Sequence, residues 1–477
     1  MLSIQRGVNL AKHPPSRLNA RMQSVLDYIE DNQSRFVDDL SEYLRFPSIS
    51  AQPEHKKDIA ACSKWIAGKC KEIGLKTEVC KTSGQPIVVA RTPRKKNSRK
   101  PHYLVYGHYD VQPPDPLELW KTPPFKPQIA NGNIYARGST DNKGQHMAHL
   151  KAVEAYLKTG TDLPCDITFI IEGEEEVGSS NLTPFVQKRK KDFKCEGVVV
   201  SDTGMPSPKH PAVTYALRGV MALEVRLDGP ARDLHSGVFG GSIENPAMAL
   251  CQLMAKCRND RGKVLVPGFY DDVEKLTKYE REQMAKVPHS DRAYLKMLGS
   301  PKIFGEPGYS ATEQRSARPT FEINGLTSGY QGEGSKTIVP SYASCKITIR
   351  LVPNQKPQTI LRQVKAHLKK VCPPSVKITI EGGHEGDPYL VAPKSDQVQA
   401  GLSALKKAFG HEAIVMREGG SIPIVNDFKK ILGADTLLLG LALPDDNLHS
   451  PNEKFSLEQY RKGMIMSAHL WQGLGAS

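Results

Sequence analysis

The chain has 477 residues, of which 39% are hydrophobic and 24% are charged, a composition typical of globular proteins that can build a sizeable core. Its longest apolar runs, such as 436–443, are much shorter than the ~20 residues of a membrane-spanning helix, which excludes a membrane protein. The net charge of +14 comes largely from clusters at 93–101 and 187–194. We interpret these clusters as solvated surface rather than a nucleic-acid interface, with electrostatic steering of anionic ligands as the open alternative.

The N-terminal 26 residues carry four basic residues and no acidic one. A loosely docked arm is the favoured interpretation and a transit peptide is the alternative, while the lack of an apolar core excludes a secretory signal. From Val25, apolar residues recur at helical spacing and predict one or two amphipathic helices. The nine cysteines cannot all pair and include no C-x-x-C motif, so we expect reduced thiols in a cytosolic protein.

Short apolar runs of β character then alternate with helical segments. The predicted strands are 86–90, 103–107, 167–171, 197–201 and 436–440, and the predicted helices are 58–72, 143–158 and 181–192. This alternation predicts an α/β fold whose mostly parallel sheet has helices on both faces.

The middle of the chain has a different pattern. Apolar and polar residues alternate at 221–227 and 345–352, as in half-exposed strands, and two amphipathic helices lie nearby. We expect a small α+β domain inserted at 213–387, with helical additions at 268–318. The larger domain would then comprise 1–212 and 388–477.

Side chains that can bind metal follow the apolar runs of the larger domain. They are His108, Asp110, Glu174, Glu175, Glu176, Asp202, Asp445, Asp446 and His449. Each has an ordinary structural explanation by itself, such as a helix cap, a turn or a solvated acidic face. Because ligands bind at the carboxyl ends of the strands in open α/β sheets, we expect these segments to converge. Asp141, which alone would be interpreted as an N-cap, adds the bridging carboxylate that a zinc pair requires.

Six motifs occur in an order typical of one protein family. They are GHYDVQPP (107–114), ARGSTDNKG (136–144), EGEEEVGSS (172–180), SDT (201–203), REGGSIP (417–423) and HSPNEKF (449–455). From about residue 30 to 470 the chain resembles the di-zinc metallopeptidases of the aminoacylase and carnosinase type, especially the cytosolic nonspecific dipeptidase branch.

The resemblance implies two divalent metal ions, with zinc favoured over manganese or cobalt. His108 and Asp202 would bind one ion, Glu176 and His449 the other, and Asp141 would bridge them. Asp110 would orient the His108 ring, and Glu175 would be the general base. The resemblance also suggests a cis peptide bond between Asp141 and Asn142.

The resemblance makes the insert a lid and dimerisation domain. His235 would stabilise the oxyanion in the partner subunit's site, and Arg350 would bind the terminal carboxylate of the substrate. Further substrate contacts would come from Thr337, Gly419, Gly420 and Ser421.

The implied function is hydrolysis of the amide bond of dipeptides or short peptides by a water that the two metal ions activate. The alternative enzyme is an N-acyl-amino-acid deacylase of the acetylornithine deacetylase or succinyl-diaminopimelate desuccinylase type. A non-catalytic relative that binds through its basic surface is disfavoured, because all five ligands and Glu175 are present. We expect a cytoplasmic homodimer with no nucleic-acid or membrane partner.

Overall fold

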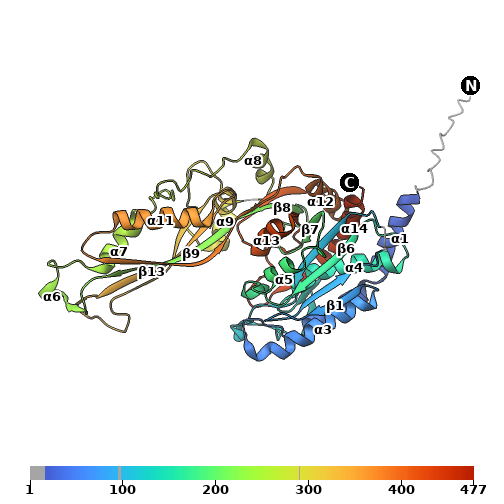
Figure 1. Ribbon diagram of the computed structural model, residues 1–477, viewed down its shortest axis with the longest axis horizontal. Coiled ribbons are helices and arrows are strands. Elements are labelled where there is room, and N and C mark those ends of the chain that lie inside the picture. The colour runs from blue at the N-terminus through green and yellow to red at the C-terminus, as the bar shows by residue number, and fades with distance from the viewer. Residues whose placement is uncertain (1–16, 95–97, 289, 477) are drawn as a thin grey trace, which may run out of the picture.

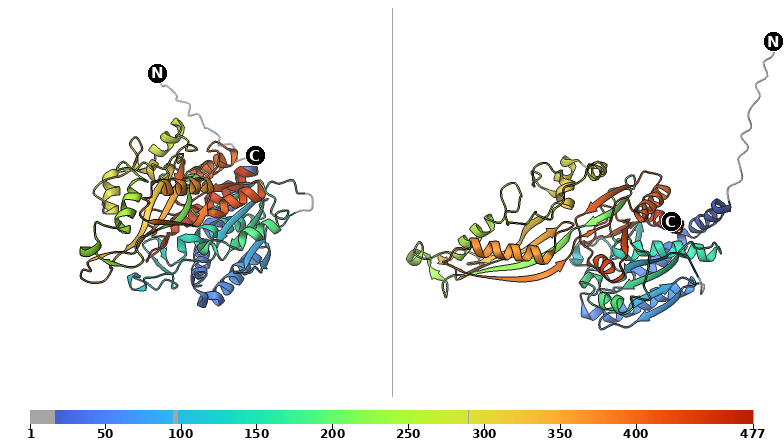
Figure 2. Two further views of the ribbon diagram at one scale, coloured as in Figure 1. Left: turned by 60° about the vertical axis from the view of Figure 1, so that its left-hand side comes forward. Right: turned by 45° about the horizontal axis from the view of Figure 1, so that its top comes forward.

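The computed structural model describes the backbone of residues 17–94, 98–288 and 290–476. It consists of two parts, each built around its own sheet (Figures 1 and 2). A nine-stranded sheet covered by helices forms the larger part, and a four-stranded sheet forms an elongated arm. The chain leaves the larger sheet after β8 (Ala212–Leu217) and returns to it at β15 (Tyr389–Leu390). The arm is therefore an insertion.

The larger sheet is parallel at its centre and mostly antiparallel towards its sides. Strands β6 (Asp166–Glu172), β3 (His102–His108), β7 (Gly197–Val200) and β17 (Asp435–Leu438) are consecutive parallel neighbours, and nearly all of their residues are buried. Across the sheet the order is β1 (Lys76–Cys80), β2 (Ile87–Arg91), β6 (Asp166–Glu172), β3 (His102–His108), β7 (Gly197–Val200), β17 (Asp435–Leu438), β8 and β15, with β16 (Ile414–Glu418) beside β8. The α/β fold class is confirmed.

Helices cover both faces of this sheet. Tyr103 and Tyr106 of β3 point to opposite faces because they are three residues apart on a strand. The Tyr103 ring contacts Trp471 with centroids 6.4 Å apart, and the Tyr106 ring contacts Phe428 at 5.7 Å. The helices of this part are α1 (Arg17–Asp31), α2 (Gln33–Leu44), α3 (Lys56–Glu72), α4 (Gln145–Lys158), α5 (Leu182–Lys188), α12 (Asp396–Phe409), α13 (Pro423–Leu432) and α14 (Leu457–Leu474). The two tyrosines thus assign α14 to one face and α13 to the other.

The insert domain is a four-stranded antiparallel sheet with helices on one face. Its strand order is β11 (Thr320–Ser328), β13 (Tyr342–Leu351), β9 (Gly219–Asp228) and β14 (Lys377–Gly386). Every second residue of β9 and β13 is buried, and α7 (Pro246–Ala255) and α11 (Pro357–Val371) supply the other side of this core. The remaining elements are β10 (Leu234–His235), α6 (Ser236–Phe239), α8 (Lys278–Ala285), α9 (Asp291–Leu298), α10 (Ala311–Ala317) and β12 (Ile338–Val339).

A third, three-stranded sheet connects distant parts of the chain. It pairs β4 (Gln128–Ala130) with β5 (Asn133–Tyr135), and β5 with β18 (Lys454–Ser456). This sheet places the loop that contains His449 beside the segment that leads to Asp141.

The strands β8 and β16 were not predicted, and three further details differ from the sequence predictions. The first helix already covers Arg17–Asp31 in the described residues, rather than starting near Val25, and Met22, Val25 and Ile29 form one buried stripe on it. Strand β11 was missed because its side chains are mostly exposed, which hides the alternation of an edge strand. Helices α8 and α10, expected to decorate the insert, also pack against β16 of the larger sheet.

Other predictions fall partly outside the described residues. The N-terminal arm or transit peptide was predicted for residues 1–26, of which 1–16 are not described and the rest belong to α1. Residues 95–97 of the basic cluster at 93–101 are also outside the described residues. Within the described ranges, no helix combines the length and the apolar character needed to cross a membrane.

Candidate metal centre

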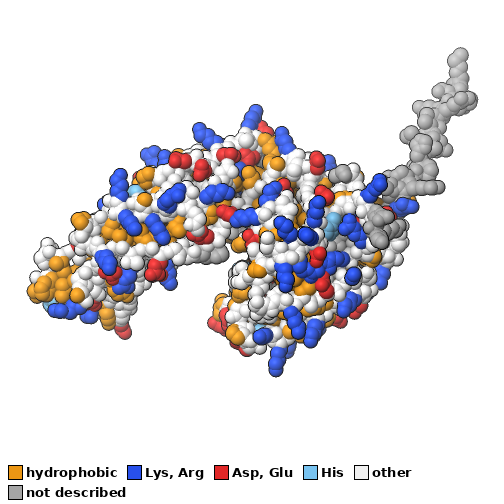
Figure 3. All heavy atoms as spheres, in the orientation of Figure 1, with side chains coloured by type: hydrophobic (Ala, Val, Ile, Leu, Met, Phe, Trp, Pro, Cys, Tyr) orange, Lys and Arg blue, Asp and Glu red, His pale blue; other side chains and the backbone are white. Residues whose placement is uncertain are grey.

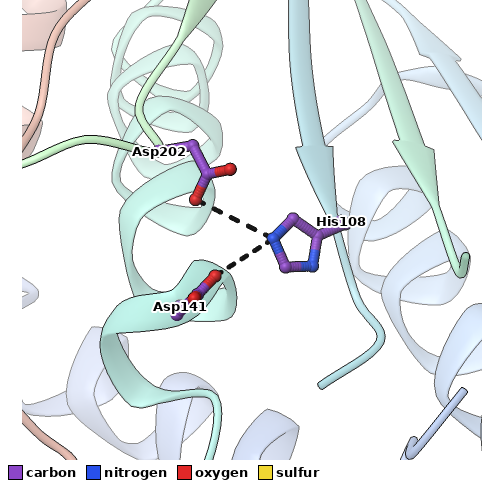
Figure 4. Close-up of side chains that lie close together, drawn as sticks. All are labelled: His108, Asp141 and Asp202. Carbon is purple, nitrogen blue, oxygen red and sulfur yellow. Dashed lines mark ion pairs between the residues drawn. The ribbon is translucent and has the colours of Figure 1, made fainter. Parts of the chain in front are cut away.

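Five predicted ligands meet at the carboxyl ends of the central strands, where an α/β sheet usually binds its ligand. His108 is the last residue of β3, and Asp202 and Glu176 follow β7 and β6. Asp141 lies in an irregular helical segment, Ser139–Gly144, directly before α4, and His449 lies in the loop after β17. Figure 4 shows His108 from its strand facing Asp141 and Asp202. The predicted convergence of four separate segments is therefore present.

These side chains form two groups that share Asp141. His108 Nε2 lies 3.2 Å from Asp141 Oδ1 and 3.8 Å from Asp202 Oδ1. His449 Nε2 lies 2.9 Å from Asp141 Oδ2 and 3.5 Å from Glu176 Oε2. Each group thus offers one imidazole and two carboxylates, and the two oxygens of Asp141 face different histidines. The peptide bond between Asp141 and Asn142 is cis, as predicted.

Unsatisfied atoms and concentrated negative charge fit cations at this place. Among the described residues, His108 Nε2 and Glu176 Oε1 are buried without a hydrogen-bond partner. Burial and the nearby Asp141 carboxylate raise the pKa of Glu176 to about 8. Burial, Asp202 and Glu176 likewise raise the pKa of Glu175 well above its ordinary value, although His108 opposes this. A divalent cation would favour the ionised carboxylates and would supply the missing partners.

Asp110 contacts both sides of the site. Its carboxylate lies 3.5 Å from His108 Nδ1, and its own carbonyl oxygen lies 3.0 Å from the same nitrogen. The two carboxylate oxygens also accept the backbone N–H groups of Glu175, at 3.3 Å, and Glu176, at 3.1 Å. Asp110 can therefore orient the His108 ring, and it also fixes the turn that bears two of the acidic residues.

Only two of the three consecutive glutamates face the site. Glu175 and Glu176 line the same cavity as Asp141. The Glu174 carboxylate points elsewhere, because it accepts hydrogen bonds from Gln85 N at 3.1 Å and Asn181 Nδ2 at 2.8 Å. The acidic run is thus divided between an anchoring residue and two site residues.

Asn142 is a site residue that the sequence analysis did not single out. Its Nδ2 donates to Asp202 Oδ1 at 2.8 Å and to the Ser201 carbonyl at 2.6 Å, while its Oδ1 accepts His108 N at 3.4 Å. The side-chain amide of Asn142 therefore contacts two candidate metal ligands, His108 and Asp202. Its position directly after Asp141 in the STDNKG segment was the available signal.

A cavity of about 690 Å³ opens beside these groups, which is ample for a small ligand. Figure 3 shows a hollow between the insert domain and the larger part. The cavity is lined by Glu175, Glu176, Asp202, Gly420, Ser421 and His449, and by residues that were not predicted, such as Met205, Leu217, Arg315, Met416 and Ile422. Its walls thus combine ligand-type side chains with apolar surface.

The predicted substrate contacts fall into two places. Near the cavity, Arg350 Nη1 donates to Ser421 Oγ at 3.1 Å, and Arg218 Nε donates to the Gly419 carbonyl at 3.1 Å. Burial and the nearby Arg350 lower the pKa of Arg218 to about 10. Arg350 lines a neighbouring cavity of about 490 Å³ rather than the cavity of the candidate ligands, and among the described residues no carboxylate forms an ion pair with its guanidinium.

His235 and Thr337 are not near the candidate ligands of their own chain. His235 lies in β10, directly before α6 at the outer end of the insert domain (Figure 1). Its exposed ring accepts the Gly237 N–H at 3.0 Å, and the neighbouring Ser236 N–H donates to the Thr337 carbonyl at 3.0 Å. Within one chain, these two residues are separated from the metal centre by the length of the arm.

Known metallopeptidases resemble this chain over nearly its full length. The Cys-Gly metallodipeptidase dug1 of Schizosaccharomyces pombe is 31% identical over 463 residues, covering 93% of this chain and 96% of the relative. The crystal structure of human carnosine dipeptidase 1 matches with a TM-score of 0.80 and 30% identity, covering 97% and 100% of the two chains. The M20 family metallo-carboxypeptidase Sso-CP2 from Sulfolobus solfataricus matches with a TM-score of 0.81 and 32% identity, covering 93% and 99%. Residues 104–473 match peptidase family M20/M25/M40, and the chain belongs to this family.

Proposed function

We propose that the protein is a metal-dependent hydrolase that cleaves the amide bond of dipeptides or short peptides. The observation that carries this proposal is the pair of imidazole–carboxylate groups sharing Asp141 at a cavity lined by Glu175. Similar proteins are a Cys-Gly dipeptidase and a β-Ala-His dipeptidase, which supports a dipeptide substrate.

In this proposal, His108, Asp141 and Asp202 hold one divalent ion, and Asp141, Glu176 and His449 hold the second. The bound ions would polarise the scissile carbonyl and lower the pKa of the attacking water. We favour zinc because it accepts imidazole nitrogen and carboxylate oxygen, with manganese or cobalt as alternatives.

Glu175 is the proposed general base. It takes a proton from the water as the oxygen attacks the carbonyl carbon, and it delivers the proton to the leaving amine when the C–N bond breaks. Its place in the cavity beside the two ligand groups supports this role. Asp110 would position the imidazole of His108 and the turn of Glu175 through the hydrogen bonds described above.

The carboxylate of the substrate would bind to Arg350, whose planar guanidinium can form two parallel hydrogen bonds. The turn formed by Gly419, Gly420 and Ser421 would contact the substrate backbone. This assignment is supported by the hydrogen bond between Arg350 and Ser421, which brings the insert domain to the edge of the cavity.

The site would be completed by a second copy of the chain. Exposed apolar side chains directly follow His235 in α6, namely Val238 (68% exposed) and Phe239 (41%), and Met248 of α7 is 57% exposed. Burying these side chains against another chain would be favourable. A homodimer through the insert domain would carry His235 and Thr337 towards the partner's cavity, where His235 would stabilise the oxyanion.

We also propose the three-segment domain division of 1–212, 213–387 and 388–477. The crossing between Gly386 and Tyr389 supports the second boundary, whereas the first crossing, at Arg218, lies five residues after position 213 because β8 belongs to the larger sheet. A cytoplasmic location is supported by the nine cysteines, all of which are unpaired, as is usual in reducing compartments.

The test is hydrolysis by protein reconstituted with zinc, manganese or cobalt. The panel contains dipeptides, acetyl amino acids and succinyl diamino acids. We expect the highest kcat/KM with dipeptides and no activity after chelation. Preference for the acylated amino acids would assign a deacylase instead, and inactivity on the whole panel despite bound metal would reject the proposal.

A further inference from the structure

Glu453 is a fully buried carboxylate next to the candidate metal centre. Its Oε2 accepts hydrogen bonds from Arg137 Nη1 and Gly138 N, both at 2.8 Å. Its Oε1 accepts the backbone N–H groups of Thr140, at 2.9 Å, and Asp141, at 3.0 Å. Both oxygens are thus fully used by four donors from one five-residue stretch that ends at Asp141.

Glu453 also belongs to the loop that bears His449. Its carbonyl oxygen accepts a hydrogen bond from Ala136 N at 3.1 Å, and the next residue, Lys454, begins the pairing of β18 with β5. Thr140 adds a further connection, because its hydroxyl donates to the Lys454 carbonyl at 2.6 Å. The segment of Asp141 and the loop of His449 are therefore joined through backbone and side-chain atoms of Glu453.

The loop needs such an anchor. Asn447, His449 and Asn452 have φ values of 56°, 59° and 62°, in the left-handed region, which asparagine and histidine adopt more often than other non-glycine residues but still infrequently. This conformation costs free energy and persists only where surrounding contacts determine it. The His449 side chain is itself 55% exposed, so packing of the ring contributes little.

We propose that Glu453 is a positioning residue that sets the distance between Asp141 and His449, and thereby the affinity for the metal ions. This inference rests on the proposed function, because it takes both residues as ligands. Glu453 itself does not reach the cavity. It acts through the backbone N–H of Asp141 and through the loop that it shares with His449, as residues behind metal ligands commonly do.

A carboxylate is needed at this position because all four neighbours are donors. In Glu453→Gln the amide has only one acceptor oxygen, and its NH₂ group would face at least one N–H donor. In Glu453→Asp both acceptor oxygens remain, but the shorter side chain withdraws them from the amides. Both variants should therefore displace the Asp141 segment.

The test measures metal binding directly, by titration calorimetry of the apoprotein with Zn²⁺ and by the visible absorption of the Co²⁺ form. Glu154→Gln is the matched control, because Glu154 is buried and paired with Lys151 at 2.9 Å and with Arg35 but lies far along α4 from Asp141. Both Gln variants should lower Tm. Only Glu453→Gln should weaken metal binding, by roughly 10–100-fold, and change the Co²⁺ spectrum.

If Glu453→Gln does not fold, Glu453→Asp provides the same comparison. Metal affinity and spectrum equal to those of Glu154→Gln would overturn the inference, since Glu453 would then be only structural. A wild-type protein that binds no metal would instead reject the proposed function, so the two failures are distinguishable.

Discussion

The two adjacent side chains of Glu174 and Glu175 provide a controlled test of the general base. We predict that Glu175→Gln retains both metal ions and lowers kcat by at least about 100-fold, because the amide cannot accept the proton. Glu174→Gln should keep most of the activity, since Glu174 faces Gln85 and Asn181 rather than the cavity. Steady-state kinetics with metal analysis would check both variants. Loss of an ion from Glu175→Gln would instead make Glu175 a ligand.

Arg350 gives a second prediction for a single residue. Replacing it with Ala should raise KM for dipeptides by roughly 10–100-fold, the usual contribution of a hydrogen bond to a charged group. The control lies in the substrate: a dipeptide amide has no terminal carboxylate, so its KM should differ little between the variant and the wild type. An equal rise of KM for both substrates would show that Arg350 supports the site without binding the carboxylate.

Single residues were predictable where a motif fixes their place. His108, Asp141, Asp202, Glu176 and His449 lie together because strand ends and tight loops leave little freedom at these positions. Their roles remain predictions. The supporting contacts were not predictable, since they depend on which distant segments meet. One example is the Glu453 carboxylate, which accepts hydrogen bonds from backbone N–H groups more than 300 positions away in the sequence. Another is the hydrogen bond from Asn142 to Asp202.

At the scale of elements, α8 is attached to the larger sheet by a buried ion pair. Glu280 of α8 accepts hydrogen bonds from Arg417 of β16 and, at 2.7 Å, from the Tyr215 hydroxyl of β8. Burial opposes ionisation, but Arg417, the Thr277 backbone and Tyr215 together lower the pKa of Glu280 to about 2. The ordinary value is 4.5. The pair therefore stabilises the fold above about pH 4.5, and this stabilisation is lost as the pH falls towards 2.

We predict that Glu280→Gln lowers the free energy of unfolding by about 3 kcal/mol at pH 7 and by less at pH 4 and below. Glu78→Gln is the matched control. Arg189 and Arg91 also lower the pKa of Glu78 to about 2, but its side chain is 42% exposed, so its loss should cost under about 1 kcal/mol. Urea denaturation across this pH range would check both values. Equal losses in the two variants would contradict the role of burial.

Burial made several strands predictable, although the buried strands β8 and β16 were missed. The buried strands β2, β3, β6 and β7 appear in the sequence as short runs of apolar residues. The edge strand β11 does not, because five of its nine residues are exposed and its register shifts between Ile323 and Gly325. The packing of α8 against β16 was also hidden, since it depends on Glu280 and Arg417 meeting across 137 positions.

At the scale of the whole molecule, the elongated shape of one chain keeps His235 away from the candidate metal centre of the same chain. The arm holds β10 at its outer end, away from the cavity that Glu175 lines (Figures 1 and 2). If the arm of one subunit reaches the site of the other, each site is built from two chains. Activity should then depend on dimerisation, and closure of the arm over a bound substrate would complete the oxyanion contact.

Mixing two inactive variants, His235→Ala and Glu175→Gln, under conditions of subunit exchange tests this arrangement. A mixed dimer would combine both defects in one site and leave the other site intact. At equal amounts about half of the dimers are mixed by random pairing, so roughly a quarter of all sites should regain activity if the two sites are independent. The control is the same mixture before exchange, which should stay inactive. Exchange demonstrated by a mass tag on one variant, yet without recovered activity, would place His235 in its own chain's site or outside the mechanism.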